Sequence, residues 1–387
     1  MENRPLITRV VLENYKSIAF CDVKLGPLSI LVGPNGAGKS NFLDALGFLS
    51  EAVNGPIEKA FEKRGELYSV LRRGGQPAVH LGFRIEFAAG YYSIRFRADG
   101  ASGFVVEREK CVIDAHPQYE AEDGLLKSQS QLKMAPLGPS RVYLPFVSGP
   151  AFNLLNGCRF YNFSHRDIRQ PVRLGMVQRI LRSDGANLSS VLYHLGLSNK
   201  AVFERILQYL RRISLGLDSL EPIEVEGFSD IKFLFEQIIE PFSPSEVSDG
   251  TIRSLAVLVA LFQRLGGAET VSLVGLEEPE TALHPAAAGV LFDAMREASA
   301  SVQVIATTHS ADLLDKKEID TDAILAIEME GGATRIGHVD ETGRLALKER
   351  LYTVGELMRM NYLRPESSTT PDESEIESVL FGDLVPA

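Results

Sequence analysis

The first third of the chain alternates between hydrophobic and polar positions in the manner of β-strands. Residues 7–13 alternate loosely, and residues 80–87, 91–96 and 104–112 alternate more regularly. Such alternation is typical of antiparallel strands with one face in the core. Residues 28–32 instead form a short apolar run, which predicts a buried strand. We therefore expect an antiparallel β region and one central strand.

Helical spacing replaces this alternation in the middle of the chain. Apolar residues recur at helical intervals at Leu188, Val191, Leu192, Leu195, Val202, Ile206, Tyr209, Leu210 and Ile213. Such stripes are more often the core faces of helices than binding grooves. No heptad pattern lasts for three or four repeats, so the sequence does not support a long coiled-coil arm. We expect a helical lobe over residues 150–246.

Strands and helices alternate in the last part of the chain. Short apolar runs at residues 271–276 and 302–306 predict buried strands, and residues 285–298 between them have a helical pattern. Helical patterns also cover residues 39–53 and 252–265. A strand–helix–strand order implies parallel strands joined by a right-handed crossover. The predicted fold class is therefore α/β with a parallel core sheet.

A glycine-rich turn follows the first buried strand. Residues 33–40, GPNGAGKS, fit the phosphate-loop pattern G-x-x-x-x-G-K-[ST] between a strand and a helix. The backbone N–H groups of such a loop surround phosphate oxygens, while Lys39 reaches the outer phosphates and Ser40 ligates Mg²⁺. Because the segment lies between a predicted buried strand and a predicted helix, a plain turn without a ligand is disfavoured. We predict ATP and Mg²⁺ as cofactors, with nucleotide contacts from Asn35, Gly36, Ala37, Gly38, Lys39, Ser40 and Asn41.

Two acids, Glu277 and Glu278, end the strand predicted at residues 271–276. A hydrophobic strand that ends in two acids is the Walker B arrangement of phosphate-loop ATPases. Glu277, where Asp is more usual, would hold Mg²⁺ directly or through water. Glu278 would orient the attacking water as the catalytic base. Solvated acids at a strand end are the alternative, and the phosphate loop in the same chain favours the catalytic interpretation.

His309 ends the next predicted strand, in the segment VIATTHS at residues 304–310. An imidazole at this place can bond the γ-phosphate or the attacking water. A single histidine after a strand is usually without function. Its position 31 residues after Glu278 favours a catalytic sensor role.

A second candidate phosphate contact precedes the helix predicted from residue 252. Ser248, Asp249 and Gly250 can present a hydroxyl and backbone N–H groups at a helix N-terminus, which suits an anion. The simpler interpretation makes Ser248 only an N-cap residue. Because one phosphate loop already holds the chain's own nucleotide, we infer that this turn contacts the nucleotide of another subunit.

Composition and charge restrict the compartment and the partners that the sequence predicts. The 387 residues carry a net charge of −11, whereas dedicated nucleic-acid binders usually carry an excess of basic residues. No long uncharged apolar run and no secretion signal are evident in the sequence. The three cysteines fit neither a disulfide framework nor a zinc site. We therefore expect a cytoplasmic protein without a membrane span. Residues 159–182 are locally basic through Arg159, Arg166, Arg169, Arg173, Arg179 and Arg182. These arginines are either solvated or form a nucleic-acid or partner surface.

The order of these motifs resembles one group of ATPases. The segments are NYKSI, GPNGAGKSN, SDGTIR, LEEPETALHP and TTHS. They resemble the RecF/SMC-related ABC ATPases, and specifically the AAA_21-type AAA family ATPases that share their head with the overcoming-lysogenisation-defect proteins. The resemblance implies that Ser248 and Gly250 act in trans on ATP held by a second copy. It also implies that residues 280–285 form the D-loop at the dimer seam, and that Lys16 and Ser17 lie beside the adenine and ribose.

The chain departs from this family pattern in three ways. Glu277 replaces the usual Asp, and only Gln170 is available as a weak candidate for the Q-loop glutamine. The C-terminal Toprim nuclease domain of longer relatives is not evident. Asp320 and Asp322 could imitate part of its metal pattern, but we interpret them as ordinary loop acids.

The resemblance implies an ABC-type head with five parts. They are an N-terminal ATPase lobe at residues 1–113, a variable loop at 114–149, a helical lobe at 150–246, a C-terminal ATPase lobe at 247–362 and an acidic mobile tail at 363–387. The predicted activity is ATP hydrolysis by a homodimer, or a higher oligomer, that forms on ATP. The favoured role is control of a separately encoded effector in a bacterial anti-phage or toxin-like module. A RecF-like DNA repair ATPase and an ATP-bound assembly scaffold with negligible turnover remain the alternatives.

Overall fold

The computed structural model describes residues 7–74, 78–100, 103–127, 137–138, 140–147, 149–173, 179–263, 271–316, 319–367 and 370–383. The chain forms two compact units, and each is described by itself. The first unit comprises Met1–Cys158, Asp320–Leu345 and Leu363–Ala387. The second comprises Arg159–Ile319 and Ala346–Tyr362.

The first unit is built on a sheet with an antiparallel region and a part that contains parallel pairs. Its strands follow the order β8-β7-β6-β5-β4-β1-β2-β16-β15-β3. Parallel pairing joins β2 to β16 and β15 to β3. The strand bounds are β1 (Ile7–Tyr15), β2 (Ile18–Lys24), β3 (Leu28–Val32), β4 (His80–Phe87), β5 (Gly90–Asp99), β6 (Gly103–Ile113), β7 (His116–Glu122), β8 (Leu125–Leu126), β15 (Ile324–Glu330) and β16 (Ala333–His338).

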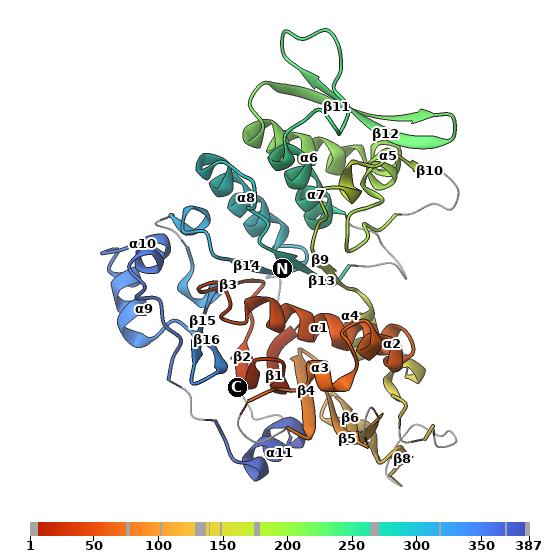
Figure 1. Ribbon diagram of the computed structural model, residues 1–387, viewed down its shortest axis with the longest axis vertical. Helices are drawn as coiled ribbons and strands as arrows, with labels where there is room; N and C mark the ends of the chain where they lie inside the picture. Colours follow the sequence, from red (N-terminus) through yellow and green to blue (C-terminus); the bar gives the residue numbers. More distant parts are fainter. Residues whose placement is uncertain are drawn as a thin grey trace. The chain divides into compact units, whose positions relative to one another are not determined.

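Helices cover both faces of the antiparallel region. The side chain of Phe83 on β4 stacks on Phe48 of α1, with ring centroids 5.4 Å apart. The next residue, Arg84, points to the other face and donates to the backbone of α11, because successive strand residues face opposite ways. Figure 1 shows α1 and α11 beside these strands. The helix bounds are α1 (Lys39–Asn54), α2 (Ile57–Glu62), α3 (Leu67–Val70), α4 (Pro150–Asn156) and α11 (Glu373–Phe381).

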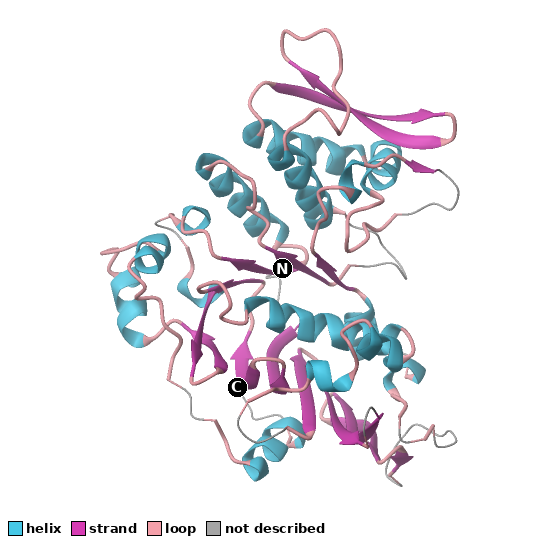
Figure 2. Cartoon of the chain, in the orientation of Figure 1, coloured by secondary structure: helices cyan, strands magenta, loops and turns pink. Residues whose placement is uncertain are grey.

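The second unit combines a parallel strand pair, a group of helices and a small separate sheet. The parallel strands β13 (Leu273–Glu277) and β14 (Gln303–Thr308) place Glu277 opposite Thr307. The small sheet has the strand order β10-β12-β11, and α5 and α6 contact it (Figure 2). The remaining bounds are β9 (Cys158–Tyr161), β10 (Val172–Arg173), β11 (Leu217–Val225), β12 (Phe228–Phe235), α5 (Leu188–Ser198), α6 (Lys200–Ile213), α7 (Asp249–Phe262), α8 (Pro285–Ala298), α9 (Glu341–Lys348) and α10 (Val354–Arg359).

The predicted α/β fold class is confirmed, and so are the predicted strands and helices around the sequence motifs. The helix predicted at residues 39–53 is α1, and the one predicted at 285–298 is α8. The lobe over residues 150–246 contains the predicted helices α5 and α6. It also contains the β11–β12 hairpin, which the sequence analysis missed. In the described residues, no helix is both long and apolar enough to span a bilayer.

The prediction of a loop from residue 114 was wrong for part of that segment. Residues His116–Glu122 form β7, which pairs antiparallel with β6. Tyr119 and Ala121 are buried, while the residues around them are polar and at least partly exposed. This alternation is too short and too polar to stand out in the sequence, so the cross-strand partner decides the structure.

The prediction of a mobile acidic tail was also wrong for its described part. Residues Glu373–Phe381 form α11, which starts with a capping box between Asp372 and Glu375. Ile376, Leu380 and Phe381 pack against Val11 in a hydrophobic cluster. The helix depends on this cluster, because a nine-residue helix is marginal in isolation.

Candidate functional site

The phosphate-loop segment turns from the buried strand β3 into α1, as its sequence predicts. Gly38 is the N-cap of α1 and has a φ of 106°, in the left-handed region that favours glycine. A Cβ atom at this position would lie 2.2 Å from Oγ1 of Thr334. Both the backbone conformation and the close approach of Thr334 therefore require glycine here.

The side chain of Lys39 lies inside this loop. It is only 6% exposed, and its Nζ donates to the carbonyl oxygens of Gly33 at 2.8 Å and Pro34 at 3.0 Å. Asn35, Gly36 and Ser40 are exposed, and Ala37 is buried. A charged phosphate is a stronger acceptor for an ammonium group than a neutral carbonyl. The loop therefore holds a positive charge where an arriving phosphate can compete for it.

Ser17, in the turn between β1 and β2, and Thr334 of β16 form hydrogen bonds that support the loop. The Oγ atoms of these two residues lie 2.6 Å apart, and Thr334 Oγ1 donates to the carbonyl of Ala37 at 2.8 Å. The amide of Asn41 donates to Ser17 Oγ at 2.6 Å. Thr334 was not among the predicted site residues, because nothing near it in the sequence marks a contact with a loop some 300 residues earlier.

Lys16 joins a charge network on α1. Its Nζ lies 2.5 Å from Oδ2 of Asp44, which also accepts from Tyr15 OH at 2.7 Å. Arg64 Nε donates to the other carboxylate oxygen of Asp44 at 2.8 Å. Burial raises the pKa of Asp44, but Arg64 and Lys16 outweigh this effect, so the pKa lies below its usual value. Lys16 is thus fixed beside the first turns of α1.

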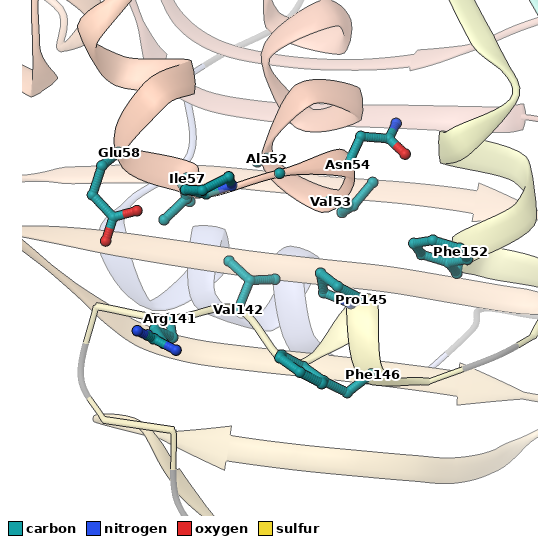
Figure 3. Close-up of a pocket in the computed structure, with 12 residues that line it drawn as sticks. Ala52, Val53, Asn54, Ile57, Glu58, Arg141, Val142, Pro145, Phe146 and Phe152 are labelled. Carbon is teal, nitrogen blue, oxygen red and sulfur yellow. The ribbon is translucent and has the colours of Figure 1, made fainter.

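A separate cavity of about 460 Å³ lies in the first unit at the opposite end of α1. Figure 3 shows its mostly apolar lining, including Val53, Ile57, Val142, Phe146 and Phe152. None of the phosphate-loop residues lines it. The cavity therefore does not belong to the predicted nucleotide contacts.

In the second unit, Glu277 ends β13 and Glu278 follows it, as predicted. The amide of Asn162 donates to Oε2 of Glu277 at 2.7 Å. Glu278 has a φ of 41°, which is uncommon for a non-glycine residue, and its backbone N donates to the carbonyl of Thr307 at 3.1 Å. Strained backbone held by its surroundings is a common feature of functional sites.

The structure brings the predicted base and the predicted sensor together. Nδ1 of His309 lies 3.0 Å from Oε1 of Glu278, and both side chains are partly exposed, at 46% and 38%. With a proton on Nδ1, His309 donates to this carboxylate. The pair can therefore hold a water molecule or a phosphate oxygen, and Glu278 stays within reach of solvent.

The predicted signature residues lie at the start of α7. Ser248 is its N-cap, and Ser248 Oγ accepts from the backbone N of Thr251 at 3.1 Å. Asp249 pairs with Arg169 at 2.6 Å, and Arg169 lowers the pKa of this carboxyl. A Cβ on Gly250 would lie 2.5 Å from the carbonyl of Ala282. This close approach joins the signature turn to the predicted D-loop.

Arg253 of α7 contacts the turn that carries the predicted base, although it was not among the predicted site residues. The residue is 6% exposed, and its guanidinium donates to the carbonyls of Glu277 at 3.1 Å and Glu278 at 3.2 Å. It also donates to Phe163 O at 3.0 Å. Burial lowers the pKa of Arg253. Arg253 therefore links α7 to the backbone of the turn that carries the predicted base.

Hydrogen bonds within the chain hold the side chains of Glu280, Gln170 and Asp320. Burial raises the pKa of Glu280, and Thr308 donates a hydrogen bond to its carboxyl group. Gln170 donates to the carbonyl of Arg166, so its Q-loop role stays a prediction. Asp320 caps a short 3-10 helix through the backbone N of Asp322. In the described part of the chain, no group of His, Cys, Asp and Glu residues is placed to hold a metal by itself.

Two solved structures show the class of fold. The SmcHead bound to the C-winged helix domain of ScpA matches with a TM-score of 0.57 and 15% identity, over 88% of this chain and 100% of that one. The Smc head of Pyrococcus furiosus matches with a TM-score of 0.52 and 13% identity, over 90% and 99%. The fold is thus that of an ABC-type phosphate-loop ATPase head.

The family follows from the sequence. The AAA_21 family, described as "AAA domain, putative AbiEii toxin, Type IV TA system", matches residues 28–106 and 149–315. These ranges make up more than half of the chain, so the chain belongs to this family of RecF/SMC-like AAA ATPases.

Curated relatives match over shorter stretches. RecF of Magnetococcus marinus, named a DNA replication and repair protein, is 32% identical over 108 residues, which are 25% of this chain and 26% of RecF. The chromosome partition protein Smc of Aquifex aeolicus is 36% identical over 116 residues, which are 29% of this chain and 9% of Smc. The chain therefore spans about a quarter or less of each relative.

Proposed function

We propose that this chain binds ATP at the phosphate loop and hydrolyses it with Glu278 as the base that orients the attacking water. The contact between Glu278 and His309, 3.0 Å apart after two adjacent parallel strands, carries this proposal. A general base needs a proton acceptor within reach of water, and the partly exposed carboxylate of Glu278 meets this condition. His309 then acts as the sensor of the γ-phosphate.

We also propose that Ser40 and Glu277 hold Mg²⁺, because each offers an oxygen ligand. Mg²⁺ prefers oxygen ligands, usually one or two protein groups together with phosphate and water. Ser40 offers an exposed hydroxyl, and Glu277 offers a carboxylate oriented by the amide of Asn162. When bound, the ion supplies positive charge that stabilises the phosphates during transfer. We assign Asn162 the role of fixing the Glu277 carboxylate.

The proposal extends to two copies of the chain that associate on ATP. Ser248 and Asp249 are exposed at the N-terminus of a 14-residue helix, where the helix dipole favours an anion. Each copy would offer this turn to the ATP of the other. The close approach of Gly250 to Ala282 would then transmit contact with the second copy to the residues after Glu278.

The proposed role is control of a separate effector in a bacterial defence or toxin-like module. The family description, which names a putative toxin and a toxin–antitoxin system, supports this role. The RecF-like alternative would need the arginines between residues 159 and 182 on the surface. Arg166, Arg173, Arg179 and Arg182 are exposed, so this condition is met for part of the set. Arg169 and Arg182 pair with Asp249 and Asp184. The family description favours the effector role, and the exposed arginines make the RecF-like role the second candidate.

The test is ATP binding and phosphate release with Mg²⁺ present, in the wild type and in Lys39→Ala. We expect the variant to bind ATP at least about a hundredfold more weakly, because a charge-assisted contact to the phosphates is lost. Lys59→Ala is the matched control, since Lys59 is an exposed lysine on α2. Equal ATP affinity in Lys39→Ala and wild type would remove the basis of the proposal.

A further inference from the structure

A buried carboxyl group lies beside the turn that carries His309. Glu280 is 7% exposed, and Thr308, the last residue of β14, is fully buried. Oγ1 of Thr308 donates a hydrogen bond to Oε1 of Glu280. The other carboxyl oxygen, Oε2, is buried and has no hydrogen-bond partner among the described residues. Thr308 is therefore the side-chain partner of this carboxyl group.

The same hydroxyl group holds the backbone around His309. Thr308 Oγ1 accepts from the backbone N of Ser310 at 2.9 Å, so this hydrogen bond spans the residue between them. A threonine hydroxyl has one proton to donate and two lone pairs with which to accept. Because its proton goes to Glu280, a lone pair remains for Ser310. The carboxyl group thus fixes the hydroxyl, and the hydroxyl fixes the turn.

Packing alone does not account for a carboxyl group at the position of Glu280. Burial raises the pKa of this carboxyl group, because the charged form loses its hydration. A buried polar group with an unsatisfied atom lowers the stability of the fold, and a leucine would fill a similar space without that cost. Buried polar groups of this kind concentrate at functional sites. The contact with Thr308 is the use that the geometry offers.

Glu280 is also the first residue of the predicted D-loop, residues 280–285. Its backbone O accepts from the backbone N of Leu283 at 3.0 Å, so its backbone belongs to the first turn of that segment. Its side chain reaches the end of β14. A change in the position of the segment therefore changes the hydrogen bond that holds the His309 turn.

We propose that Glu280 is a positioning residue for ATP hydrolysis, which holds His309 beside Glu278 through the hydroxyl of Thr308. The proposal rests on the proposed function, in which Glu278 is the base and His309 the sensor. In the structure, Nδ1 of His309 lies 3.0 Å from Oε1 of Glu278. Without the Glu280–Thr308 hydrogen bond, the His309 turn loses the contact that keeps it at this distance.

The experiment measures kcat and KM for ATP in Glu280→Gln and Glu280→Leu. Glutamine keeps the size of the side chain and an oxygen that accepts from Thr308, so kcat should stay close to the wild-type value. Leucine removes the acceptor, and kcat should fall by about tenfold to a hundredfold, as for other residues that orient catalytic groups. KM should change little. A general base would lose its activity in both variants, so this pattern separates positioning from proton transfer.

Substitutions at the other end of the hydrogen bond test the same link. Thr308→Ser keeps the hydroxyl group and should resemble the wild type, whereas Thr308→Val should lower kcat as much as Glu280→Leu does. In a His309→Ala background, Glu280→Leu should lower kcat no further, because residues that act as a unit have non-additive effects. Ser189→Ala is the matched control, since it removes a buried hydroxyl that lies 3.1 Å from Ser229 Oγ, away from the nucleotide motifs. It should leave kcat unchanged.

Hydrogen exchange in the nucleotide-free protein gives a readout that does not depend on activity. The backbone amide of Ser310 should exchange faster in Glu280→Leu than in Glu280→Gln. Equal exchange in the two variants, normal kcat in Glu280→Leu, or an additive loss with His309→Ala would overturn the inference. The expected exchange in a wild type that binds ATP without hydrolysing it would instead contradict the proposed function.

Discussion

The phosphate loop and the turn at Glu278 both follow a buried strand, yet the two are held differently. Around the phosphate loop, Lys39, Ser17, Asn41 and Thr334 all form hydrogen bonds to the loop or to each other. In the region of the Glu278 turn, Nε of Arg253 and Oε2 of Glu280 are buried and have no hydrogen-bond partner among the described residues. The side chains around the phosphate loop thus bond within the chain, whereas two buried atoms near the Glu278 turn do not.

This difference suggests different roles for the phosphate loop and the Glu278 turn. A buried polar group without a partner costs about 1–3 kcal/mol, so an arrangement that satisfies Arg253 and Glu280 would be favoured. The backbone of Glu278 already has an uncommon φ of 41°. Under the proposed function, the phosphate loop would therefore bind ATP with little rearrangement, and the Glu278 turn would be the region that responds to ATP or to a second copy.

The largest expected effect comes from Glu278→Gln. Turnover should fall by about 10² to 10⁴-fold, because a general base is lost, while ATP affinity stays near the wild-type value. Single-turnover phosphate release and equilibrium ATP binding measure the two quantities. Glu349→Gln, at an exposed residue, should change neither. Near-normal turnover in Glu278→Gln would assign the base to another residue, with Glu277 and Glu280 as the next candidates.

A smaller effect is expected from Arg253→Ala. The turn that carries Glu278 would lose its two hydrogen bonds from the guanidinium, and turnover should fall by about tenfold to a hundredfold, as for other residues that orient catalytic groups. KM for ATP should change little, because the hydrogen bonds of Arg253 to described residues go to the backbone of Glu277, Glu278 and Phe163. A raised KM with normal kcat would instead place Arg253 in nucleotide binding.

The smallest effect is expected from Thr334→Val at the phosphate loop. The substitution keeps the side-chain shape but removes the hydrogen bond to Ala37 O, which contributes about 1 kcal/mol. ATP affinity should fall by about fivefold with kcat unchanged. Thr370→Val, at an exposed threonine, is the control. A loss of turnover larger than the loss of affinity would contradict the division between the two regions.

Features that depend on residues close together in the chain were predicted, and features that depend on contacts between distant segments were missed. The phosphate loop was predicted because its strand, turn and helix are continuous in the chain, from residue 28 to residue 54. Thr334 and Asn162 were missed because their contacts with Ala37 and Glu277 join segments far apart in sequence. A single residue type without a repeating pattern gives no signal of such a contact.

The same reason explains the errors in the fold. The segment that forms β7 has few apolar residues. The helix α11 depends both on its packing against Val11 and on Arg84 of β4, whose side chain donates to the carbonyl oxygens of Leu380 and Gly382. Both elements depend on partners elsewhere in the chain. Buried strands and amphipathic helices, whose own pattern is sufficient, were predicted near their observed bounds.

The most direct test of the account is to mix two inactive variants and measure ATP hydrolysis. Lys39→Ala removes the phosphate contact of a copy's own loop, and Ser248→Arg places a bulky side chain where the ATP of the second copy would lie. If each site combines the loop of one copy with the signature turn of the other, a mixed dimer has one intact site, and activity returns on mixing. If each site forms within one chain, every site carries a lesion. No recovery in a mixture shown to contain mixed dimers would contradict the account.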